Sequence, residues 1–76
     1  MITKKKAKKL MMQGQVVYWR DEWNTFRCWY ETEEPDFFCQ DLLIDFPSGS
    51  TEPISGLWDY DECWYTAEEF KAMEIE

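Results

Sequence analysis

The chain has 76 residues, of which 8 are basic and 16 are acidic, so its net charge is −8 at pH 7. A chain of this length forms one small domain, which has little room for a ligand pocket of about 300 Å³ or more. The sequence contains no histidine and no recognisable pairing of a nucleophile with a base. We therefore expect a protein without catalytic activity.

The charge is divided unevenly along the chain. Residues 1–20 contain five lysines and Arg20 but no acid, whereas residues 21–76 contain all 16 acids against Arg27 and Lys71. Because this longer part has a net charge of −14 (16 acids against two cations), it repels phosphate, and we expect no direct binding of nucleic acid. It attracts basic surfaces instead, and surfaces that handle nucleic acid are common among those. An ordinary acidic domain without such a partner is the alternative.

The pattern predicts a single α+β domain with three parts: a basic helix or arm over residues 1–14, a small antiparallel sheet of three to five strands over 15–65, and a short helix over 66–76. Thr3 is placed to cap the first helix and Gly14 to end it. Its first lysines lie at the positive end of the helix dipole, so we expect this turn to fray. The lysines then form either a solubilising face or a basic arm.

Two strands with alternating side chains are predicted over residues 15–20 and 25–31, joined by a hairpin connection. The first strand carries bulky residues on both faces, which indicates a central strand or a sheet contacted on both sides. In the second strand Trp29 shares a face with charged residues. Trp29 is therefore a candidate exposed ring.

The second half of the predicted sheet follows from the sequence between residues 31 and 65. An acidic loop over 31–36 leads to a third strand at 37–46, where Asp41 indicates a bulge or an edge strand. The polar stretch 47–56 reads as a loop, and 57–65 as a hairpin whose alternation places rings inward and carboxylates outward.

The last helix carries the strongest local signal in the chain. Thr66 and Glu69 have the spacing of a capping box, and Tyr65 is placed to staple onto Phe70. Phe70 and Met73 form an apolar stripe. We expect this helix to close the domain against the sheet.

Cysteine spacing indicates whether the chain has a metal site, and hydropathy indicates whether it has a membrane span. Cys28, Cys39 and Cys63 have no CxxC spacing, and without histidine a zinc site would also need a carboxylate. We expect free thiols in a reducing compartment, no metal site and no cofactor. The apolar run at residues 10–12 is too short for a signal peptide or a membrane span, so we expect a cytoplasmic protein without membrane contact.

Two groups of carboxylates, each beside aromatic rings, are the candidate partner-binding residues. The first group consists of Trp29, Glu31, Glu33, Glu34 and Asp36. The second group consists of Trp58, Asp59, Tyr60, Asp61 and Glu62. At strand and turn spacings of roughly 6–7 Å, such carboxylates would approximate a row of phosphates. The pattern predicts a surface that occupies the basic channel of a nucleic-acid-binding protein.

In size, charge and α+β organisation the whole chain resembles small acidic proteins encoded by bacteriophages and prophages, namely anti-CRISPR proteins and DNA-mimicking anti-restriction proteins. This resemblance implies a non-catalytic inhibitor. Its partner would be a host nucleic-acid-binding protein or effector complex in the bacterial cytoplasm. A small structural or regulatory homodimer that buries its surplus rings is an alternative.

A second resemblance concerns the first quarter of the chain. The order helix, Gly14, strand with Val17, then Trp23 and Asn24 is similar to the start of phage proteins that sequester signalling nucleotides. This resemblance implies a further alternative, an oligomeric sponge for a small nucleotide. In such a sponge an exposed tryptophan (Trp23, or a ring of the two candidate groups) would stack on the base.

Overall fold

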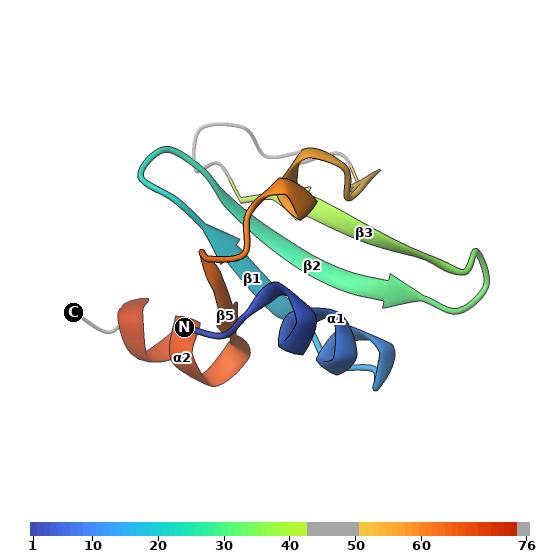
Figure 1. Cartoon of the computed structure of the whole chain (residues 1–76), viewed down its shortest axis with the longest axis horizontal. Coiled ribbons are helices and arrows are strands. Elements are labelled where there is room, and N and C mark those ends of the chain that lie inside the picture. The colour runs from blue at the N-terminus through green and yellow to red at the C-terminus, as the bar shows by residue number, and fades with distance from the viewer. Residues whose placement is uncertain (43–50, 75–76) are drawn as a thin grey trace.

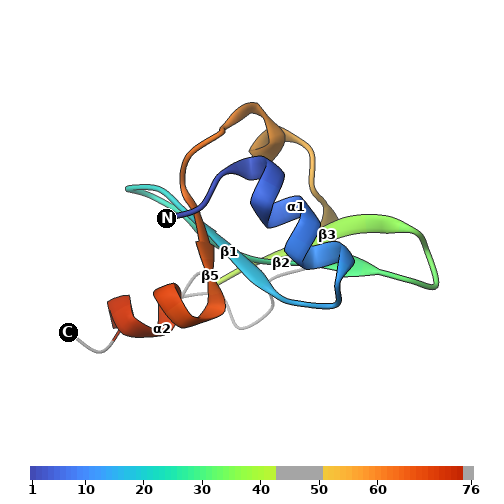
Figure 2. The same cartoon turned by 60° about the horizontal axis from the view of Figure 1, so that its bottom comes forward.

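The computed structural model describes residues 1–42 and 51–74. Five strands form one antiparallel sheet in the order β4-β3-β2-β1-β5, with helix α1 on one face and helix α2 on the other (Figure 1, Figure 2). The helices are α1 (Lys4–Met12) and α2 (Ala67–Glu74); the strands are β1 (Val17–Arg20), β2 (Thr25–Glu31), β3 (Asp36–Asp41), β4 (Thr51–Pro53) and β5 (Trp64–Thr66). The predicted α+β class and a sheet of up to five strands are confirmed.

Both ends of α1 follow the local sequence signals. Thr3 Oγ1 accepts a hydrogen bond from the amide of Lys6 at 3.1 Å, which caps the helix. Gly14 lies at φ +89°, and the amide of Gln15 reaches back to the carbonyl of Leu10 at 3.1 Å. This is a Schellman ending, which glycine favours because it has no Cβ. The first turn, which was expected to fray, is helical.

The core lies between α1 and one face of the sheet. Its buried side chains form a single cluster: Ala7, Met11, Val17, Trp19, Cys28, Cys39, Ile54 and Trp64. Alternate residues of β1, β2, β3 and β5 point into this cluster because strand side chains alternate between faces. The small core therefore depends on two large indoles from neighbouring strands.

Trp64 connects several parts of the chain in this core. Its side chain has no exposed surface, and in the sheet it stands opposite Trp19. Its indole N–H donates to the carbonyl of Tyr60 at 2.9 Å, and its ring stacks on Trp58 at 5.4 Å between centroids. Its own carbonyl accepts from the amide of Ile2 at 2.8 Å. One residue thus joins the sheet, the N-terminal segment and the chain before β5.

Of the two described helices, α2 lies on the other face of the sheet and covers one end of it. The ring of Phe70 in α2 stacks on Tyr18 of β1, with centroids 4.0 Å apart and planes within 3°. The expected staple of Phe70 was onto Tyr65, the residue that stands beside Tyr18 in the sheet. β1 lies between β2 and β5 with a helix on each face, so the prediction of a central strand is confirmed.

The predicted hairpin over 57–65 is wrong in its first half. Gly56–Asp59 form a short 3₁₀ helix, η1, in which the amide of Trp58 donates to the carbonyl of Ser55 at 3.2 Å. The adjacent residues Leu57 and Trp58 both pack against the core. A strand cannot turn two successive side chains to the same side, whereas a tight helical turn can. β5 pairs with β1 instead.

Two further expectations in this region are corrected. The predicted loop 47–56 contains the short strand β4, whose residues are all exposed, at the edge of the sheet. As a result β3 is not an edge strand, and Asp41 pairs in regular register with Phe26 without a bulge. β3 ends at Asp41. The later part of the predicted third strand and the start of the predicted loop, residues 43–50, lie outside the described residues.

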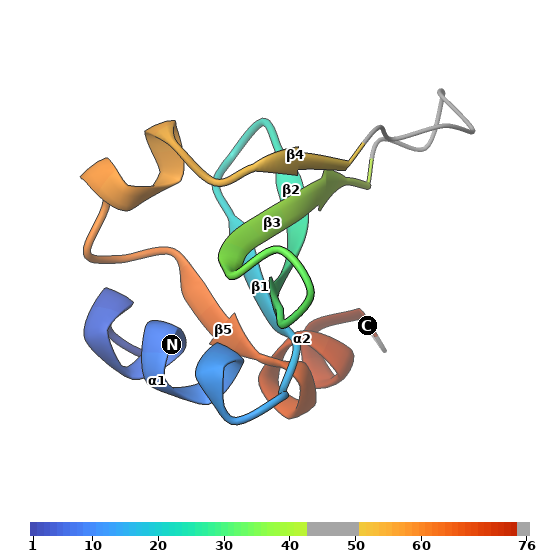
Figure 3. The ribbon, with the colours of Figure 1, turned by 90° about the vertical axis from the view of Figure 1, so that its right-hand side faces the viewer.

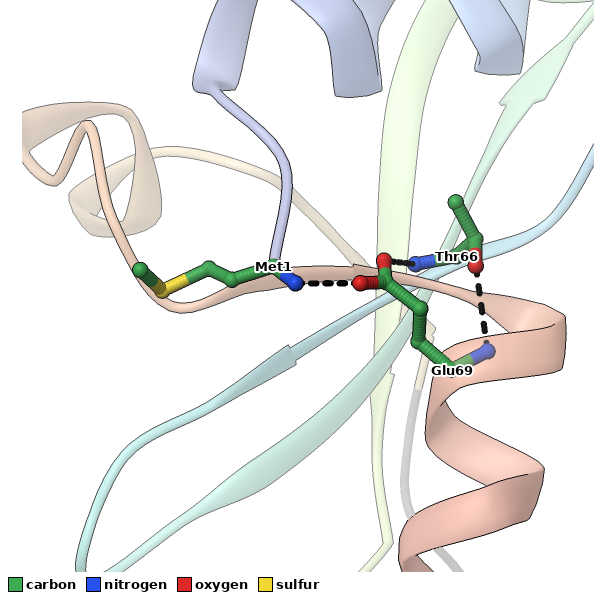
Figure 4. A network of polar contacts seen from close by, with 3 residues as sticks. All are labelled: Met1, Thr66 and Glu69. Atoms are coloured by element: carbon green, nitrogen blue, oxygen red, sulfur yellow. Dashed lines mark hydrogen bonds and ion pairs between the residues drawn. The ribbon is translucent and has the colours of Figure 1, made fainter.

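The capping box at the start of α2 is confirmed. Thr66 Oγ1 accepts from the amide of Glu69 at 3.1 Å, and Glu69 Oε1 accepts from the amide of Thr66 at 3.0 Å (Figure 4). The second carboxylate oxygen of Glu69 pairs with the terminal ammonium of Met1. These hydrogen bonds, first that of the ammonium and then that of the Thr66 amide, lower the pKa of Glu69 below its ordinary value of 4.5.

We predict that Glu69→Gln removes a pH-dependent part of the stability. Because the folded-state pKa of Glu69 is below 4.5, its contribution is complete above that pH and disappears as the pH falls through the lower folded value. At neutral pH the loss is about 0.2–1 kcal/mol, the range for exposed ion pairs. Urea unfolding between pH 7 and pH 3 measures it. Glu68→Gln, with the same charge change in the same turn, is the control; an equal pH dependence in both variants would contradict the assignment.

Candidate functional site

The first predicted group of carboxylates gathers at the end of the β2–β3 hairpin. Glu33, Glu34 and Asp36 are exposed and Glu31 is half-buried. Glu31 and Asp36 are directly opposite one another in the antiparallel register, where like charges repel. Within residues 1–42 and 51–74 no ion pair reaches any of these four side chains. The hairpin end therefore presents concentrated negative charge to its surroundings.

Aromatic rings lie beside these acids on the sheet face opposite the core. Trp29 and Phe38 are neighbours across β2 and β3, on the same face as Glu31, and both are half-buried. The guanidinium of Arg27 lies over the Trp29 ring at 5.1 Å from its centroid. α2 packs on β5 and β1, away from this half of the face, and Figure 3 views the hairpin end on. The arrangement combines two half-buried rings, one of them under the Arg27 guanidinium, with carboxylates at the hairpin end.

The second predicted group is differently arranged. Its acids Asp59, Asp61 and Glu62 are exposed, and so is Tyr60, with an exposed fraction of 51%. Trp58 is half-buried and does not form an outward ring, because it packs between Trp64 and Phe37. These acids lie at the end of η1 and in the connection that follows it, away from the β2–β3 turn, which forms one end of the molecule (Figure 1). The two groups therefore do not form one continuous row.

Lysines of α1 approach this second group. Lys4 Nζ donates to the carbonyl of Trp58 at 2.9 Å and lies 3.7 Å from Asp61 Oδ1. Lys8 Nζ lies 5.2 Å from the centroid of the Trp58 ring and 5.6 Å from that of Phe37. The N-terminal cations thus neutralise part of the second group, and the first group is the more strongly anionic of the two.

The approach of α1 to η1 also creates a hollow. A cavity of about 290 Å³ is lined by Lys4, Lys5, Lys8 and Trp58. The sequence did not predict this pocket, which is close to the size that so small a domain was expected to lack. The one available signal was the spacing i, i+1, i+4 of the three lysines, which brings them to one side of a helix.

The cysteines are free, as predicted. Cys28 and Cys39 stand opposite one another in the core, and burial raises the pKa of both thiols. Desolvation also raises the pKa of Cys63. Such thiols stay protonated near neutral pH and are poor nucleophiles and poor metal ligands. Over the part of the chain that the structure describes, no three cysteines or acids are grouped to hold a metal ion, and neither helix is long and apolar enough to span a membrane.

Comparisons of the chain with protein-family models, with curated proteins and with solved structures found no match. The resemblance to anti-CRISPR and DNA-mimicking proteins therefore stays a prediction from size, charge and organisation. A function for the acidic β2–β3 hairpin or for the pocket beside Trp58 has to follow from the residues of those two regions.

We predict opposite stability effects for two lysines of α1. Lys5→Gln removes a cation from the positive end of the helix dipole and raises the free energy of unfolding by about 0.3–1 kcal/mol. Lys9→Gln removes a cation from the last turn, where it is favourable, and lowers that free energy by a similar amount. Both side chains are exposed and both variants change the charge equally. Thermal or urea unfolding at low salt measures the difference; shifts of the same sign would contradict it.

Proposed function

We propose that this protein is a non-catalytic inhibitor that binds a basic nucleic-acid-binding surface of another protein. A host defence complex in the bacterial cytoplasm is the partner that the size, charge and organisation of the chain favour. The β2–β3 hairpin is the main contact in this proposal. Its carboxylates would occupy positions that the phosphates of DNA or RNA take in the partner's channel.

The observation that carries the proposal is the grouping of unpaired charge at the hairpin. Glu33, Glu34 and Asp36 are exposed next to Glu31, and none of the four has an ion-pair partner among the described residues. Among the exposed acids outside the hairpin, Asp61 pairs with a lysine side chain, that of Lys4. A field of one sign speeds association with a surface of the opposite sign.

The composition of the neighbouring face supports the same interpretation. Trp29 and Phe38 form an apolar area next to Glu31, and no described helix covers it. Aromatic residues are enriched in the energetically important centres of protein interfaces, while charged residues surround them. The hairpin could therefore contribute both long-range attraction and short-range contact.

Folding alone does not explain this concentration of acids. Like charges directly opposite one another in a sheet, as at Glu31 and Asp36, are destabilising by roughly 0.2–1 kcal/mol. A surface with both signs interspersed would keep the protein in solution without that cost. Binding of a basic partner offsets the repulsion.

We predict that Glu33→Lys combined with Glu34→Lys weakens partner binding at least about tenfold, because it reverses the charge where the hairpin meets the partner. Glu22→Lys combined with Glu68→Lys is the matched control, since both residues are exposed acids on other elements. The control should change the affinity less than about twofold. The proteins would be titrated calorimetrically against purified RNA-guided effector complexes and restriction enzymes.

Salt dependence provides the second criterion of the same experiment. Affinity for the partner should fall by at least about tenfold between about 50 mM and 200 mM salt. Binding that ignores salt, or equal weakening by the hairpin pair and the control pair, would reject the proposal. Sedimentation of the free protein tests the homodimer alternative, which requires a stable dimer at micromolar concentration.

A further inference from the structure

The pocket beside η1 collects positive charge that the fold does not neutralise. Lys4, Lys5 and Lys8 line it together with Trp58. Lys4 has Asp61 as an ion-pair partner at 3.7 Å, whereas no ion pair involves Lys5 or Lys8 within the described residues. The Lys8 ammonium lies over the rings of Trp58 and Phe37 instead. On a protein with a net charge of −8, two ammonium groups without a carboxylate partner among the described residues thus share one hollow.

This arrangement opposes the stability of α1. Lys4 and Lys5 stand in the first helical turn, at the positive end of the dipole, which favours anions. Lys4 and Lys8 are an i, i+4 pair of like charges, which repel along one helix face. An anion bound by Lys5 and Lys8 would offset both unfavourable interactions.

The pocket also has an aromatic wall. Trp58 is held in place by stacking on Trp64 and by edge contact with Phe37. The Lys8 ammonium lies over its ring at 5.2 Å from the centroid. Because Lys8 has a flexible side chain, it can turn toward an anion and uncover the indole. The cavity of about 290 Å³ is larger than one phosphate group needs.

We propose that this pocket binds a small organic phosphate that carries a planar ring, of the size of a nucleoside monophosphate. The phosphate oxygens accept hydrogen bonds from Lys5 and Lys8, and the ring packs against Trp58. Lys4 stays tied to the Trp58 carbonyl and fixes that wall of the pocket.

This site is distinct from the proposed protein-binding surface. The pocket is lined by residues of α1 and η1, and α1 lies on one side of the sheet (Figure 2). Trp29 belongs to the opposite face of the sheet, and the acidic β2–β3 turn is at one end. Its chemistry is also opposite, since it attracts anions. The hairpin variants Glu33→Lys and Glu34→Lys should therefore leave ligand binding in the pocket within about twofold of its original affinity. Failure of one proposal does not affect the other.

Adenosine monophosphate and ribose 5-phosphate are the probes, since they share the phosphate and the sugar and differ in the base. We expect saturable binding of adenosine monophosphate, at least about tenfold tighter than that of ribose 5-phosphate, with a shift of the Trp58 indole signal in NMR spectra. Equal affinity for the two probes would refute the ring contact. Absence of saturation up to about 1 mM adenosine monophosphate would refute the site.

Variants with the same net charge locate the binding. Lys5→Gln combined with Lys8→Gln should weaken adenosine monophosphate binding at least about tenfold. Lys6→Gln combined with Lys9→Gln, on the same helix but outside the pocket lining, should change it less than about twofold. Equal weakening in both pairs would show attraction to the helix as a whole and would overturn the assignment. Circular dichroism checks that α1 remains helical in each variant.

Discussion

Burial of Trp64 is the constraint on which the rest of the structure depends. A domain of 76 residues has little core to share, and here one tryptophan joins the sheet, the N-terminal segment and the chain before β5. Its backbone holds Ile2 and its N–H holds Tyr60, while its ring supports Trp58. Because η1 and the start of α1 are both fixed to the same residue, Lys4 reaches the Trp58 carbonyl. The packing around Trp64 therefore positions the pocket that Lys4, Lys5, Lys8 and Trp58 line. The end of the β2–β3 hairpin lies outside this packing.

Positive and negative side chains gather in different regions of this small molecule. The lysines of α1 meet the chain near Trp58, and the carboxylates of the hairpin stand at another end without cationic partners among the described residues. The ion pair of Lys4 with Asp61 lies near Trp58 and does not involve the hairpin. Like-charge groupings lower stability, and they persist in proteins where a function uses them. The charge pattern therefore favours two binding surfaces of opposite sign, one for a basic protein and one for a small anion.

Local signals predicted a large part of the fold. The end of α1 depends on the conformation of Gly14, and the start of α2 depends on the capping box at Thr66. Both features involve only residues that are close together in the sequence. The prediction of a strand at Trp58 failed because the direction of that ring is decided by the distant Trp64. β4 was missed because three exposed residues ending in Pro53 carry no hydrophobic period. The acidic hairpin was visible in the sequence, since strand pairing and charge composition are both local there. The pocket around Lys8 depends on how α1 docks, which periodicity alone does not give.

Hydrogen exchange in a Trp64→Phe variant tests most directly whether this indole holds the pocket in place independently of the hairpin. Phenylalanine fills part of the space but cannot donate to the Tyr60 carbonyl. We expect the amide of Trp58, which donates to the carbonyl of Ser55, to exchange at least about tenfold faster. The amide of Leu42, which follows β3 and donates to the carbonyl of Thr25 in β2, should change less than about twofold. An equal acceleration at both amides, or none at Trp58, would contradict the account.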